Sequence, residues 1–257
     1  MASIDANREE PAAEAAALEL ADRLGEAAGP AERLRVLADR VSGAVFTTSF
    51  GIEDQLLTHH IFTQRLPIRI VTLDTGRLFP STYQLWQETE ERYGRRIHSF
   101  HPDQTQLAAF VADAGINGFY HSKDARTGCC FVRKVEPLGR ALDAASAWVV
   151  GLRADQSGQR SSLAPASWDS AHGLIKVAPL FDWTRDQVAL ACETLAVPVN
   201  SLHAKGFLSI GCEPCTRAIQ PGEPERAGRW WWENDEAREC GLHLDSDGRL
   251  VRAKVAA

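Results

Sequence analysis

The sequence lacks a long hydrophobic run and a basic N-terminal segment. No apolar stretch approaches the ~18 residues that a membrane helix requires, so we expect no contact with a membrane. The first residues, MASIDANREEPAAEAAALELADRL, are acidic and have no positively charged start typical of a secretory signal peptide. These absences favour a cytoplasmic protein, in which structural disulfides are rare and cysteines more often bind metal or do chemistry.

An excess of positive charge is also missing. The formal net charge is −6, whereas surfaces that bind nucleic acid are basic, so we expect no nucleic-acid partner. The chain has no internal repeat, and its low-complexity sequence is confined to the Ala/Glu-rich start. A length of 257 residues suits one sizeable α/β domain. The sequence leaves the oligomeric state open, a homo-oligomer included.

Short β-rich runs alternate with helical segments. Strands are predicted at 43–50, 68–75, 96–100 and 146–153, with an edge strand at 174–179 after a polar linker at 154–173. Helices are predicted at 12–26, 31–41, 52–64, 80–93, 103–114, 123–143 (interrupted near Gly128) and 184–196 (capped by Thr184). The alternation predicts a single α/β domain with a mostly parallel sheet flanked by helices.

Polar or glycine-containing loops follow three of these strands. They are Ser49-Phe50-Gly51, Asp74-Thr75-Gly76 and Gly151-Leu152-Arg153. Ligands of parallel sheets bind beyond the carboxyl ends of the strands, so the layout predicts a nucleotide-sized crevice there.

Four of the six cysteines occur in two close pairs. Cys212 and Cys215 form a Cys-x-x-Cys loop, and Cys129 and Cys130 are adjacent. Four thiolates around one zinc crowd to roughly 3.8 Å apart, which strains adjacent helical residues that point about 100° apart. A cubane gives each thiolate its own iron, so the pattern favours a 4Fe-4S cluster over zinc. The alternative is that Cys129 and Cys130 are small buried hydrophobic residues.

The other two cysteines differ in their surroundings. Cys192 lies within a helix among Ala, Leu and Val and reads as a core residue. Cys240 lies in a polar segment with Arg238 and His243 nearby, where no apolar periodicity would bury it. A thiol near cationic groups can ionise and act as a nucleophile. The alternative is an exposed cysteine without a role.

The motifs together resemble the bacterial, thioredoxin-dependent assimilatory adenylyl-sulfate reductases of the phosphoadenylyl-sulfate (PAPS) reductase family. The resemblance covers about residues 41–245. It is carried by SFGIED (49–54), LDTGRLFPSTY (73–83), CC (129–130), GLRADQSGQR (151–160), GCEPCTR (211–217), ERAGRWWWE (225–233) and ECGLH (239–243). The combination of CC, CxxC and ECGLH is highly specific, whereas any one alone would not be.

The resemblance implies a fold like that of the adenine nucleotide alpha-hydrolases, related to the ATP pyrophosphatases. SFGIED takes the place of their SGGxDS phosphate loop, from which Phe50 and Glu53 depart. We further expect a helical segment at 1–40, a nucleotide-binding and iron–sulfur domain at 41–232, and a C-terminal tail at 233–257 that is mobile, because it begins with the polar run ENDEARE. We expect the three tryptophans at 230–232 to pin the base of this tail to the core.

The implied reaction is reduction of adenosine 5′-phosphosulfate (APS) to sulfite and AMP, in sulfate assimilation. Cys129, Cys130, Cys212 and Cys215 would ligate one 4Fe-4S cluster per subunit. Cys240 would attack the substrate sulfur and form an S-sulfocysteine, from which thioredoxin, or a glutaredoxin-like donor, releases sulfite.

The resemblance also implies a set of substrate-binding residues. Positive groups that offset the negative charge of the phosphosulfate are expected at Lys134, Arg226, Arg229, His243, Arg153 and Arg160. The adenosine is expected near Ser49, Gly51, Asp54, Leu73, Thr75 and Gly151. For each arginine taken alone, a solvated surface charge is the simpler interpretation.

Three other functions are compatible with parts of the pattern. A PAPS reductase, or an enzyme of dual APS/PAPS specificity, shares the fold, although the most similar PAPS reductases lack the four cluster cysteines. A tRNA-thiolating pyrophosphatase is disfavoured by the missing SGGxDS loop and the acidic net charge. A zinc-stabilised, non-enzymatic adenine-nucleotide sensor would be colourless and would not need Cys240.

Overall fold

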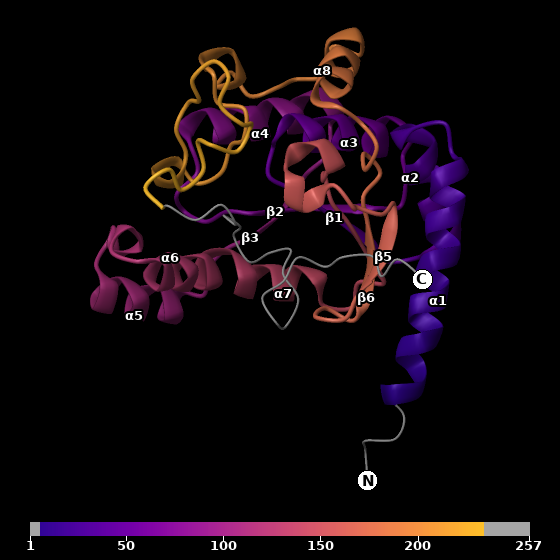
Figure 1. The fold of residues 1–257 in the computed structure, drawn as a ribbon, viewed down its shortest axis with the longest axis horizontal. Helices are drawn as coiled ribbons and strands as arrows, with labels where there is room; N and C mark the ends of the chain where they lie inside the picture. The colour runs from indigo at the N-terminus through magenta and orange to yellow at the C-terminus, as the bar shows by residue number, and fades with distance from the viewer. Residues whose placement is uncertain (1–5, 234–257) are drawn as a thin grey trace.

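The computed structural model describes residues 6–233, which form a six-stranded sheet between layers of helices (Figure 1). The strands are β1 (Ala44–Thr48), β2 (Arg69–Leu73), β3 (His98–Phe100), β4 (Ala147–Val149), β5 (Ala166–Asp169) and β6 (Leu174–Val177). They lie in the order β3-β2-β1-β4-β6-β5, and every neighbouring pair is parallel except β5 and β6. The predicted α/β fold with a mostly parallel sheet is confirmed.

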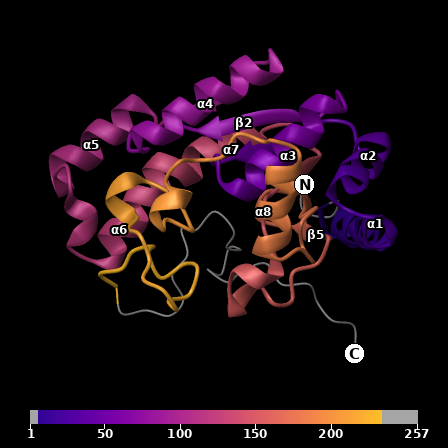
Figure 2. The same ribbon diagram turned by 90° about the horizontal axis from the view of Figure 1, so that it is seen from above.

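Helices cover both faces of this sheet (Figures 1 and 2). One layer contains α2 (Pro30–Arg40), α3 (Ile52–Thr63), α4 (Pro80–Tyr93) and α8 (Arg185–Thr194). The other contains α5 (Gln104–Ala114), α6 (Lys123–Cys130) and α7 (Glu136–Leu142). None of the helices in residues 6–233 is long and apolar enough to cross a lipid bilayer.

The side chains of β1 show why the sheet has two apolar faces. Phe46 packs with Leu56 of α3 in one buried cluster, whereas Val45 packs with Leu138 of α7 in another. Successive side chains of a strand point to opposite faces, so a continuous apolar run is what a sheet covered on both sides requires.

Two local signals set helix boundaries where the sequence predicted them. Pro80 occupies the first turn of α4, where its missing N–H costs no hydrogen bond. Thr184 caps α8 by accepting a hydrogen bond from the backbone N–H of Gln187, and the Gln187 side chain accepts one from the Thr184 N–H in return.

The prediction for residues 154–179 was wrong in two respects. The polar linker contains the strand β5, and β5, not β6, is the edge strand. The inner strand β6 pairs with β4 on one side and antiparallel with β5 on the other. Strand β5, with the sequence Ala-Ser-Trp-Asp, has too little apolar periodicity to reveal itself.

The interruption in the 123–143 helix also lies elsewhere than predicted. Gly128 is within α6, and the change comes after Cys130, where residues Phe131–Val135 form a π-helical turn, η2. Such turns are rare and occur mostly at functional sites.

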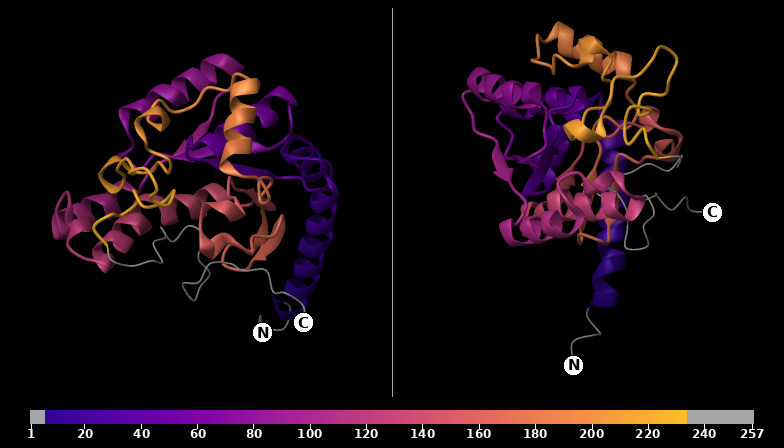
Figure 3. Two further views of the ribbon diagram at one scale, coloured as in Figure 1. Left: turned by 45° about the horizontal axis from the view of Figure 1, so that its top comes forward. Right: turned by 90° about the vertical axis from the view of Figure 1, so that its left-hand side faces the viewer.

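The two ends of the described chain pack differently. Leu20 and Leu24 of α1 (Ala6–Glu26) join the core cluster that contains Phe46, so α1 lies against the β5 side of the domain (Figure 3). Residues 200–233 contain only short 3-10 turns and fold back beside α4 and α6. The predicted tail, apart from Glu233, lies outside the described residues.

Candidate active site

A pocket opens where β1, β2 and β4 end, as the strand-end loops predicted. Its strand-end walls include Thr48, Ser49, Gly51, Leu73, Thr75, Val150 and Gly151. The opposite walls come from residues distant in sequence, among them Lys134, Arg160, Leu208, Gly211, Glu225, Arg226, Arg229 and Trp230. The six residues predicted to lie around adenosine therefore all line one pocket.

The loop after β1 is held closed by Asp54. The Asp54 carboxylate accepts hydrogen bonds from the backbone N–H and the hydroxyl of Ser49, at 2.6 and 2.7 Å. Burial raises the pKa of Asp54 to about 7, and the Ser49 hydrogen bonds only partly offset this effect. Asp54 can therefore change its protonation state near neutral pH, in the wall of the pocket.

Phe50 adopts an unusual backbone conformation in this loop. Its φ is +59°, in the left-handed region that favours glycine. The side chain is 1% exposed and stacks on Trp86 at a ring-centroid distance of 5.6 Å. Burial and stacking thus offset the backbone strain at the position where the sequence departs from a glycine-rich phosphate loop.

Gly151 is needed because Asp54 approaches its backbone closely. A Cβ at residue 151 would lie 2.1 Å from Asp54 Oδ1, whereas a Cβ at Gly158 would meet nothing within 4 Å. We predict that Gly151→Ala displaces Asp54 and weakens AMP binding at least about tenfold, or roughly 1.4 kcal/mol. Gly158→Ala should stay within about twofold. Isothermal titration with AMP tests this, and equal affinities for the two variants would contradict it.

Four basic side chains line the same pocket. They are Lys134, Arg160, Arg226 and Arg229, which were all predicted to bind substrate. Arg229 is largely buried, and its guanidinium lies 4.6 Å from the centre of the Trp230 ring. Arg160 is buried as well, whereas Lys134 and Arg226 are half-buried. Such a cluster of cations in the wall of a polar cleft is suited to binding an anion.

Arg153, the fourth arginine predicted to bind substrate, does not line the pocket. Its side chain is fully buried, and its guanidinium pairs with Glu53 at 2.8 Å, Glu225 at 2.7 Å and Asp155 at 3.0 Å. The sequence could not show which way this side chain turns after β4. His243 and Cys240 lie outside the described residues.

Three of the four paired cysteines gather behind the pocket. Cys212 and Cys215 pack with Phe119 and Trp230 in one buried cluster, and Cys129 packs against it. Cys130 is buried as well, and its negative charge, when ionised, would stabilise the Arg126 guanidinium. No disulfide joins any of the cysteines in residues 6–233. The fold therefore brings the CC and CxxC pairs, more than 80 positions apart, to one region.

The thiols in this region differ in acidity. Burial raises the pKa of Cys129, and it raises that of Cys215 to about 11. Burial opposes ionisation of Cys212 too, but the charge of Lys134, a 3.3 Å hydrogen bond with the Thr75 hydroxyl and the charge of Arg229 outweigh it. The pKa of Cys212 is lowered as a result, so this sulfur is prepared to be a thiolate.

The surroundings of the thiols can be tested against a thiolate-bound inorganic centre. Trp230 is 1% exposed, and its indole N–H has no hydrogen-bond partner among residues 6–233. A buried donor without an acceptor is costly, and a sulfur acceptor in the adjacent cysteine cluster would satisfy it. Within the same residues, no three His, Cys, Asp or Glu side chains are grouped so that they could hold one metal ion. The donor chemistry fits such a centre, although the thiols do not form a closed single-ion site.

The π-helical turn joins the cysteine region to the pocket. It carries Arg133, whose guanidinium donates to the Thr75 carbonyl at 2.6 Å, and Lys134, which lines the pocket. This turn is wider than the ordinary α-helical turn that the predicted helix at 123–143 would have between Cys130 and Lys134. As a consequence, Lys134 lines the pocket, and its positive charge also lowers the pKa of Cys212.

Some pocket residues were missed by the sequence reasoning. Glu225 and Gln156 line the pocket and connect to Arg153 and Arg160 through hydrogen bonds. No signal in the sequence distinguishes them from surface polar residues. Trp148 was missed because it reads as a strand core residue, although it reaches the pocket and donates to the Thr47 hydroxyl at 2.8 Å.

Comparisons with known proteins agree with this geometry. Residues 43–218 match the family described as phosphoadenosine phosphosulfate reductase domain. The chain is 54% identical to the adenosine 5′-phosphosulfate reductase of Agrobacterium fabrum, over 89% of this chain and 84% of that protein. It is 49% identical to the enzyme of the same name from Allochromatium vinosum, over 91% and 86%.

A solved structure is also similar. The phosphoadenylyl-sulfate reductase of Candida auris, in a phosphate complex, superposes with a TM-score of 0.67. It is 27% identical, over 78% of this chain and 95% of that one. The family match spans more than half of this sequence, so the chain belongs to the phosphoadenosine phosphosulfate reductase domain family.

Proposed function

We infer that this chain is an oxidoreductase that reduces adenosine 5′-phosphosulfate to sulfite and AMP in sulfate assimilation. The observation that carries this function is one pocket at the strand ends, lined by four basic side chains and backed by the paired cysteines. The similarity to proteins named adenosine 5′-phosphosulfate reductase, at 54% and 49% identity, supports the same conclusion.

Two groups of residues that line the pocket suit the two parts of the substrate. The adenosine would lie against the strand ends, near Ser49, Gly51, Asp54, Leu73, Thr75 and Gly151. The phosphosulfate would lie under Lys134, Arg160, Arg226 and Arg229, with His243 as a further cation from the C-terminal segment. These positive charges would offset the repulsion between an anionic nucleophile and an anionic substrate.

The chemical step would be covalent. The Cys240 thiolate would attack the sulfur of APS, forming a sulfur–sulfur bond while the bond between sulfur and the phosphate oxygen breaks. AMP leaves with the electron pair, and Cys240 keeps the SO3 group as an S-sulfocysteine. Arg226 and Arg229 would stabilise the charge that develops on the phosphate oxygen.

Sulfite would be released by thiol exchange. One thiolate of reduced thioredoxin, or of a glutaredoxin-like donor, attacks the Cys240 sulfur and expels sulfite. The second thiol of the donor then breaks the mixed disulfide and restores Cys240. The two electrons come from the donor dithiol, which ends as a disulfide. A dithiol donor of this kind places the reaction in the reducing cytoplasm.

The four paired cysteines are proposed as ligands of a 4Fe-4S cluster, one per subunit. Cys129, Cys130, Cys212 and Cys215 would supply the thiolates, and the Trp230 N–H and the Thr75 hydroxyl would donate to sulfur. The cluster, when bound, supplies fixed charge and structural support, and the electrons of the reaction come from the dithiol donor.

The choice of APS over PAPS rests on similarity and on charge. The APS reductases noted above are about twice as identical to this chain as the PAPS reductase. Asp54 also lines the pocket, and it is hydrogen-bonded to Ser49 rather than paired with Arg153, so its charge, when ionised, would oppose the additional phosphate of PAPS.

Steady-state assays of sulfite release with reduced thioredoxin test this function. We expect kcat/KM for APS to exceed that for PAPS at least about 100-fold, which corresponds to roughly 2.7 kcal/mol. Equal values would establish dual specificity, and a preference for PAPS would overturn the choice. A colourless protein that binds AMP but releases no sulfite would favour the nucleotide sensor instead.

A further inference from the structure

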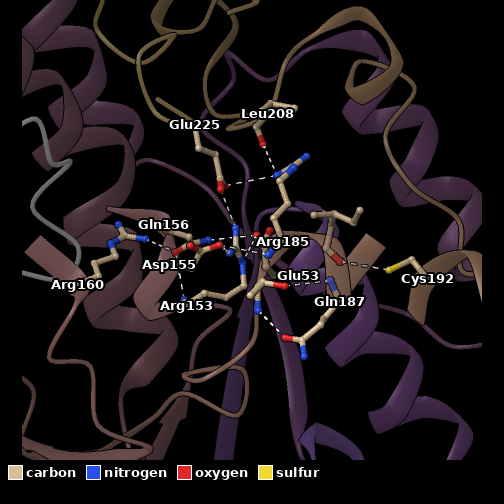
Figure 4. Close-up of polar contacts among 12 residues, drawn as sticks. Glu53, Arg153, Asp155, Gln156, Arg160, Arg185, Gln187, Cys192, Leu208 and Glu225 are labelled. Atoms are coloured by element: carbon tan, nitrogen blue, oxygen red, sulfur yellow. Dashed lines mark hydrogen bonds and ion pairs between the residues drawn. The ribbon is translucent and has the colours of Figure 1, made fainter. Parts of the chain in front are cut away.

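Arg153 is the centre of a buried charge network beside the pocket (Figure 4). The guanidinium is fully buried, and each of its three nitrogens donates to a carboxylate. Nε contacts Glu53 at 2.8 Å, Nη2 contacts Glu225 at 2.7 Å, and Nη1 contacts Asp155 at 3.0 Å. Each nitrogen of the guanidinium thus contacts a carboxylate, and Arg153 is not among the residues that line the pocket.

The two shorter contacts join parts of the chain that are distant in sequence. Glu53 belongs to the first turn of α3, directly before Asp54. Glu225 directly precedes Arg226 and belongs to the same loop as Arg229. Arg153 therefore connects the strand-end wall of the pocket, from behind, to the loop that carries two of its cations.

A third connection leads to Arg160. The Gln156 side chain donates to Glu53 at 3.2 Å and accepts from the Arg160 guanidinium. The backbone N–H of Arg153 also donates to Gln156, at 3.2 Å. Figure 4 shows Gln156 between Arg153 and Arg160. Three of the four cations that line the pocket, Arg160, Arg226 and Arg229, thus belong to segments that converge on Arg153.

The network is sensitive to the loss of Arg153 because two of its three carboxylates are largely buried. The side chains of Glu53 and Glu225 are 10% and 15% exposed, whereas that of Asp155 is 54% exposed. Burial raises the pKa of Glu225, although Arg153 and Arg185 oppose this rise. Arg185 contacts Glu225 at the longer distance of 3.4 Å, so it compensates the charge less well. Without Arg153, two carboxylates would face the pocket with little compensation.

We propose that Arg153 is a positioning residue, which pairs Glu53 with Glu225 and thereby holds Arg226 and Arg229 over the phosphosulfate. The proposal rests on the proposed function, and it replaces the prediction from the sequence that Arg153 contacts the substrate. A second consequence is that Arg153 keeps the negative charge of Glu53 and Glu225 from repelling the nucleotide.

A double-mutant cycle on the full chain, with its iron, distinguishes positioning from substrate contact. Arg153→Met is made in the wild-type background and in the background Glu53→Gln/Glu225→Gln. The dissociation constant of AMP and the KM for APS are measured in all four proteins. We expect Arg153→Met to raise both at least about tenfold in the wild-type background and less than about threefold in the double-glutamine background.

Three outcomes would overturn the proposal. An equal loss in both backgrounds would mean that Arg153 contacts the substrate directly. Unchanged AMP affinity of the folded Arg153→Met protein, with only a lower melting temperature, would mean a role confined to folding. A loss as large for Arg217→Met would make the effect unspecific, since Arg217 pairs with Glu223 at 2.8 Å on the same segment but at the surface and away from the pocket.

The result of the double-mutant cycle can be judged independently of the proposed function, because AMP binding is measured without turnover. A wild-type protein that binds AMP but makes no sulfite from APS would contradict the proposed function. The AMP dissociation constants of the four proteins would still test the role of Arg153. A normal rate of sulfite release, combined with equal losses in both backgrounds, would overturn the role of Arg153 alone.

Discussion

Adding APS without a reductant is expected to leave one SO3 group on the protein, and Cys240→Ser is expected to abolish this adduct and sulfite release. A serine hydroxyl is hardly ionised at neutral pH, and the alcohol lacks the sulfur with which thioredoxin must exchange. The measurement is intact-protein mass spectrometry before and after reduced thioredoxin is added. The adduct should disappear from the wild-type protein as sulfite appears.

Cys192→Ser is the matched control for this experiment. Cys192 is buried in α8, its thiol contacts the Ile52 carbonyl at 3.7 Å, and burial raises its pKa to about 12. Such a thiol is not a nucleophile at neutral pH, so the control should form the full adduct. An adduct that persists in Cys240→Ser, or sulfite released by that variant at the wild-type rate, would show that another group attacks the substrate.

The second large effect is expected from Cys212→Ser, which should remove most of the iron of the proposed 4Fe-4S cluster, together with the brown absorbance near 400 nm that this cluster would give. Cys212 is the sulfur whose pKa is lowered by Lys134, the Thr75 hydroxyl and Arg229, against the effect of burial. Serine is a poor ligand for iron, and it removes the thiolate that this field stabilises. We expect kcat/KM for APS to fall at least about 100-fold.

Iron analysis and visible absorbance separate this effect from a loss of catalysis alone. Cys192→Ser should retain its iron, because Cys192 belongs to the main core and not to the cluster of Phe119, Cys215 and Trp230. Full iron content in Cys212→Ser would remove Cys212 from the ligand set. An iron-free variant with wild-type activity would show that the reaction does not depend on a cluster.

The sequence predicted the fold where local signals and tertiary packing agree. Thr184 caps the N-terminus of α8 with its side chain, and Pro80 fits the first turn of α4 because the N–H it lacks has no partner there. Both effects act within one helical turn, so the sequence reveals them. Strand β5 was missed because its buried residues, Ala166 and Asp169, do not alternate with exposed ones and are not large apolar side chains. The strand exists because it pairs with β6, which is a tertiary contact. The π-helical turn after Cys130 was not predicted, although Pro137, which cannot donate to the carbonyl of Arg133, is a local signal that the helix is irregular there.

The candidate site was predictable in its residue types but only partly in its geometry. The family resemblance assigned Lys134, Arg226 and Arg229 to substrate binding, and all three line one pocket in the structure. A shared motif does not determine the direction of a side chain. Arg153 was therefore predicted to bind substrate, although its side chain lies behind the wall of the pocket. Glu225 escaped notice because its role depends on an arginine 72 positions earlier in the chain.

The edges of the sheet restrict how copies of this chain could associate. On one side, α1 packs against β5 and shields its outer backbone groups. On the other, β3 is only three residues long and offers few free N–H and C=O groups. Long, open borders are what invite strand addition between molecules and aggregation. Within residues 6–233, two copies of this chain would therefore associate through helix or loop surfaces. The sheet that carries the nucleotide pocket would then not continue from one molecule into the next.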